Sequence, residues 1–353
     1  MIVILKYHIK NYRFTSNKME NLEKKAKELR LKTLDLALKT GEGHLGGSFS
    51  EIELLLALYE KILKKEDKFI LSKGHAYGPF CIILQEKGYN PKITGHPDLD
   101  EENGIYATTG SLGHGLPIAV GMALARKLKK QNGNIYVLMS DGECQEGTTW
   151  ESSDIAAYYK LNNLIAIVDH NKIQSDLHVK DTGDLGDLEN KFNAFGWAVL
   201  RCGGHDFEAL SKTFELAKKI KDRPQAIIAD TLKGKGVSFM ERLGEDGLYK
   251  FHSGAPSAEQ YDAALGEILA RVNFSLKSAG EEELKLESRE IEIKAPPEKV
   301  LRLNAAYGDE LVKIARDRQD IVALDADLVL DTGLLPFKKA FPERYLECGI
   351  AEQ

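Results

Sequence analysis

Two short apolar stretches constrain the fold of this chain more than any other feature. Residues 134–140 read NIYVLMS and residues 163–170 read NLIAIVDH, and both are almost continuously apolar and rich in β-branched side chains. Such runs are typical of strands that are buried on both faces of a parallel sheet. A helical pattern at residues 148–161 separates them, and further strand-like and helix-like segments follow up to residue 232. The sequence therefore predicts an α/β fold with a doubly wound, mostly parallel sheet and helices on both faces.

The composition changes along the chain and predicts four segments. Residues 1–18 contain no acidic residue and form an N-terminal extension, for which a misplaced start codon is a simpler explanation than a transit peptide. Residues 19–274 contain the α/β pattern, and residues 275–297 form a charged linker that ends in a Pro pair. Residues 298–353 begin a second region of similar architecture. Because this segment is much shorter than the roughly 100 to 150 residues of a usual domain, we expect it to be incomplete.

Charge and composition argue against several classes of protein. The chain of 353 residues has 48 Lys and Arg against 54 Asp and Glu and a net charge of −6, with no basic stripe interleaved with aromatic residues. A nucleic acid is therefore not expected as a partner. The apolar N-terminal run MIVIL is far shorter than the roughly 20 residues of a membrane span, so no membrane is expected either. The four Cys residues show neither a CxxC pair nor a zinc spacing, which favours a cytoplasmic protein.

One glycine-rich turn imitates a nucleotide-binding motif. Residues 41–47 read GEGHLGG and match the dinucleotide fingerprint GxGxxG. That fingerprint binds phosphate only when a strand leads into it and a helix leaves it. Here the helical pattern of residues 22–38 leads into the turn, so we do not expect a dinucleotide site.

Polar side chains follow both apolar stretches. Asp141 comes directly after the first and Asn171 directly after the second, a spacing of about one βαβ unit. A right-handed crossover makes such strands parallel and places both side chains at the same carboxyl edge, where ligands bind. These oxygens and a nearby carbonyl suit Mg²⁺ or Ca²⁺ shared with a phosphate group, which the amide of Gly142 can face. Taken alone, Asp141 is better explained as a helix cap and Asn171 as a turn residue.

The surrounding motifs change that balance. The segment 140–174 resembles the thiamine diphosphate signature, an Asp-Gly followed about thirty residues later by Asn, in the form used by transketolases. The resemblance runs from about Lys25 to the end of the chain. Its motifs occur in the family's order: GHLGGSFS, SKGHA, GHP, TTGSLGHG, SDGECQEG, DHNKI, FHSG, ADL and GIAEQ. The chain is identified on these motifs as a member of the transketolase family.

The resemblance implies a cofactor and a metal ion. In the family, the matching Asp, Asn and backbone carbonyl hold Mg²⁺, or Ca²⁺, against the diphosphate of thiamine diphosphate, and here they are Asp141, Asn171 and Ile173. Further positions match residues that lie against the cofactor or link the two sites of the dimer. They are His75, Gly110, Leu112, Gly142, Glu146, Asn171 and Asp327.

The resemblance also implies catalytic and substrate residues. Glu352 matches the Glu that hydrogen-bonds the aminopyrimidine of the cofactor and promotes its imino form, and in the family it is donated by the second subunit. Arg302 matches a ligand of the substrate phosphate, for which forked guanidinium geometry is suited. Histidine suits the removal and return of a hydroxyl proton near neutral pH. The histidines that match the substrate channel are His44, His96 and His252.

The expected function is that of a transketolase, a transferase that moves a two-carbon ketol unit between sugar phosphates. We expect a homodimer, or a heterotetramer with a chain that carries the rest of the pyrimidine-binding domain and the C-terminal domain. Two alternatives stay open at this point: the thiamine-dependent component of a 2-oxo acid dehydrogenase, and a catalytically silent half that binds cofactor or partner. Several histidines have no assigned role: His8, His114, His170, His178 and His205.

Overall fold

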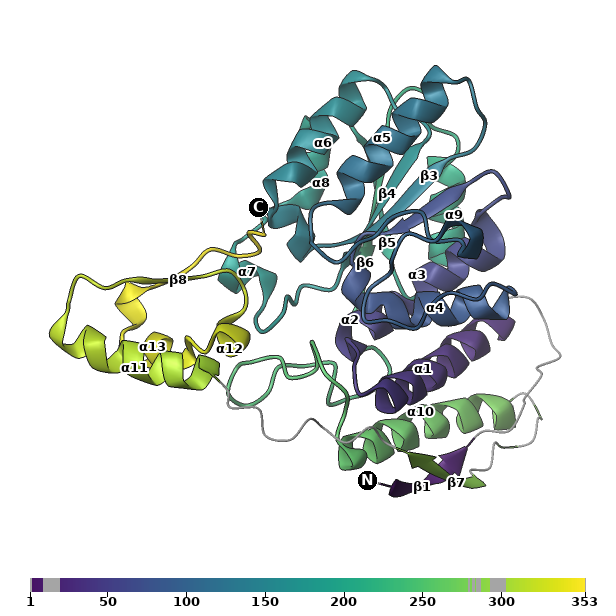
Figure 1. Ribbon diagram of the computed structural model, residues 1–353. Helices are drawn as coiled ribbons and strands as arrows, with labels where there is room; N and C mark the ends of the chain where they lie inside the picture. Colours follow the sequence, from purple (N-terminus) through teal and green to yellow (C-terminus); the bar gives the residue numbers. More distant parts are fainter. Residues whose placement is uncertain are drawn as a thin grey trace.

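A five-stranded parallel sheet forms the centre of the molecule (Figure 1). The computed structural model describes residues 2–8, 20–278, 280, 283, 287–292 and 303–352. The strand order β2-β3-β4-β6-β5 and the parallel pairing of every neighbour confirm the predicted fold class. The strands are β2 Lys68–Leu71, β3 Ile135–Ser140, β4 Leu164–His170, β5 Ala198–Gly203 and β6 Gln225–Asp230.

Helices cover both faces of this sheet because alternate side chains of each strand point to opposite sides. Tyr136 and Leu138 of β3 belong to one buried cluster, and Val137 and Met139 belong to the other. The first cluster contains α1 Glu20–Thr40, α2 Leu45–Ser50, α3 Ile52–Ala57, α4 Tyr77–Glu86, α9 Phe207–Ala217 and α10 Ala258–Ser278. The second contains α5 Gly115–Leu128, α6 Gly147–Tyr158 and α8 Leu188–Ala194.

Short helical segments fill the connections. The turn at Gly41 follows helix α1 and not a strand, as predicted from the sequence for the GxGxxG match. The Asp206 side chain begins α9 by accepting hydrogen bonds from the backbone N–H groups of Glu208 and Ala209. The remaining short elements here are the π-helix η1 Leu58–Ile62, the 3₁₀ turns η2 Gly74–Ala76, η3 Glu101–Asn103 and η4 Gly142–Gln145, and α7 Val179–Thr182.

Residues 303–352 form a second, smaller α/β unit beside the first (Figure 1). Its parallel two-stranded sheet packs on a small core that includes Ala315, Phe337 and Tyr345. Its elements are α11 Leu303–Asp317, β8 Ala323–Asp325, α12 Val329–Thr332, α13 Leu335–Ala340, η5 Pro342–Arg344 and β9 Tyr345–Glu347. The exposed fraction of Leu324 is 63% and that of Leu346 is 50%, so one face of this sheet is uncovered.

A third, two-stranded sheet joins segments that lie far apart in the sequence. Strand β1 Ile2–His8 pairs antiparallel with β7 Glu287–Glu292. These strands fall in the predicted extension and linker, and helix α10 also runs past the proposed boundary at residue 274. The domain boundaries themselves stay a prediction. Across the described part of the chain, no helix is both long and apolar enough to cross a membrane.

Candidate active site

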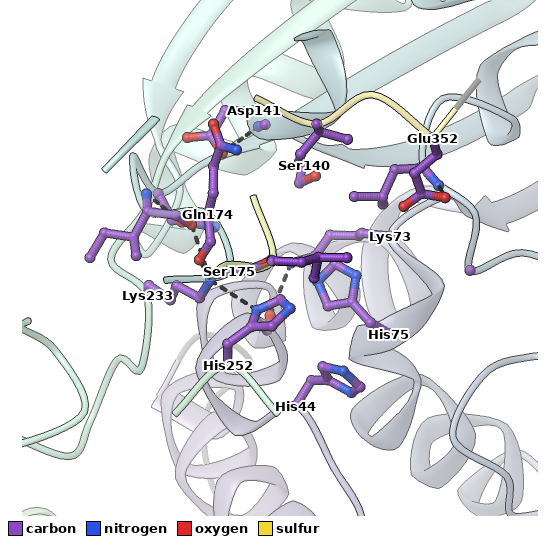
Figure 2. A pocket seen from close by; sticks show the side chains of 18 of the residues that line it. His44, Lys73, His75, Ser140, Asp141, Gln174, Ser175, Lys233, His252 and Glu352 are labelled. Carbon is purple, nitrogen blue, oxygen red and sulfur yellow. Dashed lines mark hydrogen bonds between the residues drawn. The ribbon is translucent and has the colours of Figure 1, made fainter. Parts of the chain in front are cut away.

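A cavity of about 160 Å³ lies at the carboxyl ends of the central strands (Figure 2). It forms where the turns after β2, β3, β4 and β6 meet, the edge at which open parallel sheets bind ligands. Most of the predicted site residues line it: His44, His75, His96, Gly110, Leu112, Asp141, Gly142, Asn171, Ile173, His252 and Glu352. Glu146 and Asp327 contact the lining residues Glu352 and Ser175. Arg302 lies outside the described residues.

The proposed metal ligands meet at the ends of β3 and β4. The buried Asp141 carboxylate accepts hydrogen bonds from the backbone N–H groups of Gly142 at 2.8 Å and Lys172 at 2.5 Å. The Asn171 side-chain oxygen accepts from the backbone N–H of Ile173 at 3.1 Å. Burial raises the pKa of Asp141, and a bound cation would oppose that shift because it stabilises the carboxylate.

The chemistry of this donor set fits a hard cation only when a ligand adds oxygens. Among the described residues, no group of three or more His, Cys, Asp or Glu could hold a metal by itself. One carboxylate, one amide oxygen and one carbonyl suit Mg²⁺, which usually keeps several positions for water or phosphate oxygens. Three buried atoms around the cavity also lack a hydrogen-bond partner of normal geometry, namely His44 Nδ1, Gln174 Nε2 and Asp327 Oδ1. Since buried polar groups are normally satisfied, the cavity fits a polar ligand.

Four histidine side chains gather on one side of the cavity. The ring centroid of His44 lies 5.4 Å from that of His75, 5.8 Å from that of His96 and 5.2 Å from that of His252. Burial, helped by neighbouring positive charge, lowers the pKa of His44 to about 4 and those of His75 and His252 well below the ordinary value. These three rings are therefore neutral near pH 7. The sequence predicts histidines that titrate near neutral pH, and burial is the reason for the difference.

Lys233 is a site residue that was missed from the sequence. Its ammonium group donates to the carbonyl oxygens of Ile173, at 3.1 Å, and of Gln174, and it lies 3.3 Å from His252 Nδ1 (Figure 2). Burial lowers the pKa of Lys233 to about 8. A signal was present in the sequence, because Lys233 follows the strand-like run QAIIADTL in a glycine-flanked turn at the same sheet edge.

Lys73 occupies the floor of the cavity and is equally buried. Its ammonium group pairs with Asp169 and, at 3.2 Å, with Glu51, and it donates to the Gly47 carbonyl oxygen at 2.9 Å. The two carboxylates raise the pKa of Lys73 against the effect of burial. These contacts connect Lys73, which precedes His75, to helix α2, which follows His44, and to β4, and so they hold in place the segments that carry both histidines.

Glu352 reaches the cavity from the second α/β unit. Its carboxylate accepts from the backbone N–H of Leu112 at 2.9 Å, and its own N–H donates to Glu146 at 2.5 Å. The backbone N–H of Ile350 donates to the side chain of Gln145 at 2.6 Å. All three contacts lie within one chain, whereas the resemblance implies that the second subunit donates this Glu. Two copies of the chain that exchange their second α/β units would make the same contacts between subunits. Donation of Glu352 by the second subunit therefore stays a prediction.

The fold and the cavity define an α/β protein with a polar ligand site at the carboxyl edge of a parallel sheet. Residues 22–248 match the family model described as "Transketolase, thiamine diphosphate binding domain". The chain is 36% identical over 275 residues to one subunit of the apulose-4-phosphate transketolase of Phocaeicola vulgatus, and the match covers 72% of this chain and 96% of that protein. The chain therefore belongs to the transketolase family and is a transketolase-type transferase.

Full-length transketolases match over a longer part of this chain. The transketolase of Mus musculus is 31% identical over 368 residues, which cover 95% of this chain and 57% of that protein. The crystal structure of the Campylobacter jejuni transketolase superposes with a TM-score of 0.62 at 23% identity, over 95% of this chain and 62% of the other. The chain thus spans over half of these transketolases and nearly all of the Phocaeicola vulgatus protein.

Proposed function

We propose that this chain provides the diphosphate side of a transketolase that transfers a two-carbon ketol unit from a ketose phosphate to an aldose phosphate. The observation that carries the proposal is the placement of Asp141 and Asn171 across a single cavity from His44 and His252. Oxygen donors for a metal and a diphosphate thereby face the groups that can handle hydroxyl protons. The family match favours transketolase over the 2-oxo acid dehydrogenase alternative.

The chain's own residues would hold cofactor and metal as follows. Asp141, Asn171 and the Ile173 carbonyl would bind Mg²⁺, and the ammonium of Lys233 would turn from that carbonyl toward the diphosphate. The backbone amide of Gly142 begins η4 and can donate to a phosphate oxygen. Thiamine diphosphate, when bound, supplies the nucleophilic carbon and the electron sink of the reaction.

Proton handling falls to the histidines and to Glu352. In neutral His252, Nδ1 accepts from Lys233, which places the ring proton on Nε2, where it can be donated to a substrate oxygen. His44, with its Nδ1 unpaired, can accept a hydroxyl proton. Glu352 would hold a proton at a ring nitrogen of the aminopyrimidine. Because His44 and His252 are largely buried, their contacts with a substrate would be less screened by water than contacts of the exposed Glu352.

The exposed face of the β8–β9 sheet supports the proposal that a partner chain binds there. Leu324 and Leu346 lie side by side in register on this sheet and are at least half exposed, an arrangement that native sheets avoid. We propose that the rest of the pyrimidine-binding domain covers this face and is carried by a second chain in a heterotetramer. Relatives whose names describe them as single subunits of a transketolase support this arrangement. One of them, from Actinobacillus succinogenes, is 38% identical over 271 residues.

A turnover assay with partner addition tests the function. The chain, alone and mixed with a candidate partner chain that carries the rest of the pyrimidine-binding domain, is supplied with thiamine diphosphate, Mg²⁺, xylulose 5-phosphate and ribose 5-phosphate. We expect turnover only in the mixture and none without Mg²⁺. Cofactor binding by calorimetry without turnover of any ketose phosphate would instead identify a silent cofactor-binding half. Absence of both in the mixture would reject the proposal.

A further inference from the structure

A buried network of charged side chains joins helices α1 and α3 to the turns that follow β5 and β6. Arg30 of α1 makes a two-pronged pair with Glu53 of α3, with N–O distances of 2.8 and 2.9 Å. Both side chains are less than a tenth exposed. Glu53 also accepts from Nδ1 of His205, at 2.9 Å. His205 is one of the histidines to which the family motifs assign no role.

The two ring nitrogens of His205 have distinct and fixed partners. The backbone N–H of Leu232 can only donate, so His205 Nε2 must accept it, at 2.9 Å. The proton of the neutral ring is then on Nδ1, which donates to the carboxylate of Glu53. Arg30 and His205 together hold the pKa of Glu53 at about 2 against the effect of burial, so the carboxylate stays charged.

The same network is hydrogen-bonded to the turn that carries Lys233. His205 holds the turn at the N–H of Leu232, while Nε of Arg30 donates to the carbonyl of Lys235 at 2.6 Å. Lys233 lies between these two attachment points. The N–H of Gly234 donates to the Gly46 carbonyl at 2.9 Å, which adds a third attachment. The turn is therefore fixed on both sides of the residue that projects into the cavity.

We propose that His205 is a positioning residue: through Leu232 it sets the turn so that the ammonium of Lys233 reaches the cavity and orients His252. A role of His205 in catalysis rests on the proposed function. Its role in positioning Lys233 is independent of that function. Removing the ring leaves the N–H of Leu232 without its acceptor and takes one of two donors from Oε2 of the buried Glu53, which keeps the hydrogen bond from Arg30. The loss of such a buried hydrogen bond shifts the equilibrium between the ordered turn and displaced forms of it by roughly tenfold to a hundredfold.

Chemical labelling of the cofactor-free chain tests the positioning. Acetic anhydride modification, read by mass spectrometry, is compared at Lys233 and Lys73. We expect His205→Phe to increase labelling of Lys233 roughly tenfold and to leave Lys73 unchanged, because Lys73 is held by other groups. His205→Gln, which keeps an acceptor for the Leu232 N–H, should restore most of the protection. The matched control is His170→Phe, which removes a ring paired with Asp230 at 3.0 Å near the same turn.

Two further measurements make the result decisive. Nitrogen NMR of histidine-labelled wild-type protein should show His205 as a neutral ring protonated on Nδ1. Calorimetry with thiamine diphosphate and Mg²⁺ should show that His205→Phe weakens binding roughly tenfold, but not in a Lys233→Met background. An equal effect in both backgrounds, equal labelling gains at Lys233 and Lys73, or the opposite tautomer would each overturn the proposal. If the wild-type assembly binds no cofactor, the proposed function fails while labelling and NMR still decide the positioning.

Discussion

The two α/β units of this chain differ in how completely they cover their sheets. In the first unit every residue of β3 is buried, and helices lie on both sides of the five strands. In the second unit the two strands β8 and β9 are covered on one face, and Leu324 and Leu346 are exposed on the other. The first unit can therefore build and fix its half of the site without help. The second leaves an apolar face of its sheet exposed, and such a face is suited to an interface.

The largest expected effect tests whether the first unit holds the metal ion and the diphosphate. Asp141→Ala should abolish the Mg²⁺-dependent binding of thiamine diphosphate, with a loss of affinity above roughly a hundredfold, because the diphosphate loses the ion that neutralises it. Calorimetry on the assembled protein checks this. Asp154→Ala changes an exposed carboxylate on α6 and serves as the matched control. Unchanged affinity in Asp141→Ala would remove Asp141 from the metal site.

Replacement of a cavity histidine in the same unit should lower catalysis without disturbing folding. His252→Ala is expected to lower turnover by roughly 10² to 10⁴, the usual contribution of a positioned acid or base. The thermal unfolding of the chain should change little in comparison. His178→Ala, which alters a histidine that does not line the cavity, is the control. Wild-type turnover in His252→Ala would leave this residue a structural one.

The features of the molecule differ in how far they could be predicted from sequence. The parallel sheet and the meeting of Asp141 with Asn171 follow from short-range patterns, because apolar runs and βαβ spacing fix which edge a residue reaches. Lys233 was missed because its only signal is its position in a turn after a strand-like run, and a lysine in such a turn is usually solvated. The lowered pKa values of His44 and His252 were missed because burial arises from residues distant in sequence. The pairing of β1 with β7 was missed for the same reason, since its partners lie near opposite ends of the chain.

The relation between the two units can be tested by complementation. Glu352→Gln and Asp141→Ala chains should each be inactive in the complete assembly. If dimers exchange their second units, mixed dimers contain one intact site and one doubly altered site, so about a quarter of wild-type activity should return. Activity of the mixture no higher than that of either parent, with subunit exchange verified, would establish that each site is built within one chain.

A smaller effect is expected at the exposed face of the second unit. Leu324→Asp combined with Leu346→Asp should weaken association with the partner chain by roughly tenfold to a hundredfold, since charged groups would be buried in an apolar interface. The isolated chain should lose little stability, because both positions are exposed in it. Leu128→Asp, at an exposed position on α5, is the control for surface charge. Analytical ultracentrifugation of the mixed chains measures the outcome, and an unchanged affinity would place the partner elsewhere.

The smallest expected effect is a difference between the two units in how their stability depends on pH, which follows from where the histidines lie. All nine His residues precede residue 303, so the second unit has none. The pKa of His44 is about 4 in the folded chain and lies near 6.5 when unfolded. Between these values the unfolded chain binds the proton and the folded chain does not, so the contribution of His44 to stability falls as the pH falls from 6.5 toward 4. Glu51 and Glu143 act in the opposite direction, because burial raises their pKa values to about 8 and 7.

Because these opposing groups make the total pH dependence hard to assign, the test is a difference between two proteins. Urea unfolding, followed by the fluorescence of Trp150 and Trp197, reports on the first unit alone. From pH 7 to pH 5 the wild type should lose about 1 to 2 kcal/mol of unfolding free energy relative to His44→Gln. Hydrogen exchange at Phe337 should show no such difference, since its unit contains no histidine. Parallel pH profiles of the two proteins by fluorescence would show that His44 does not titrate as a buried group.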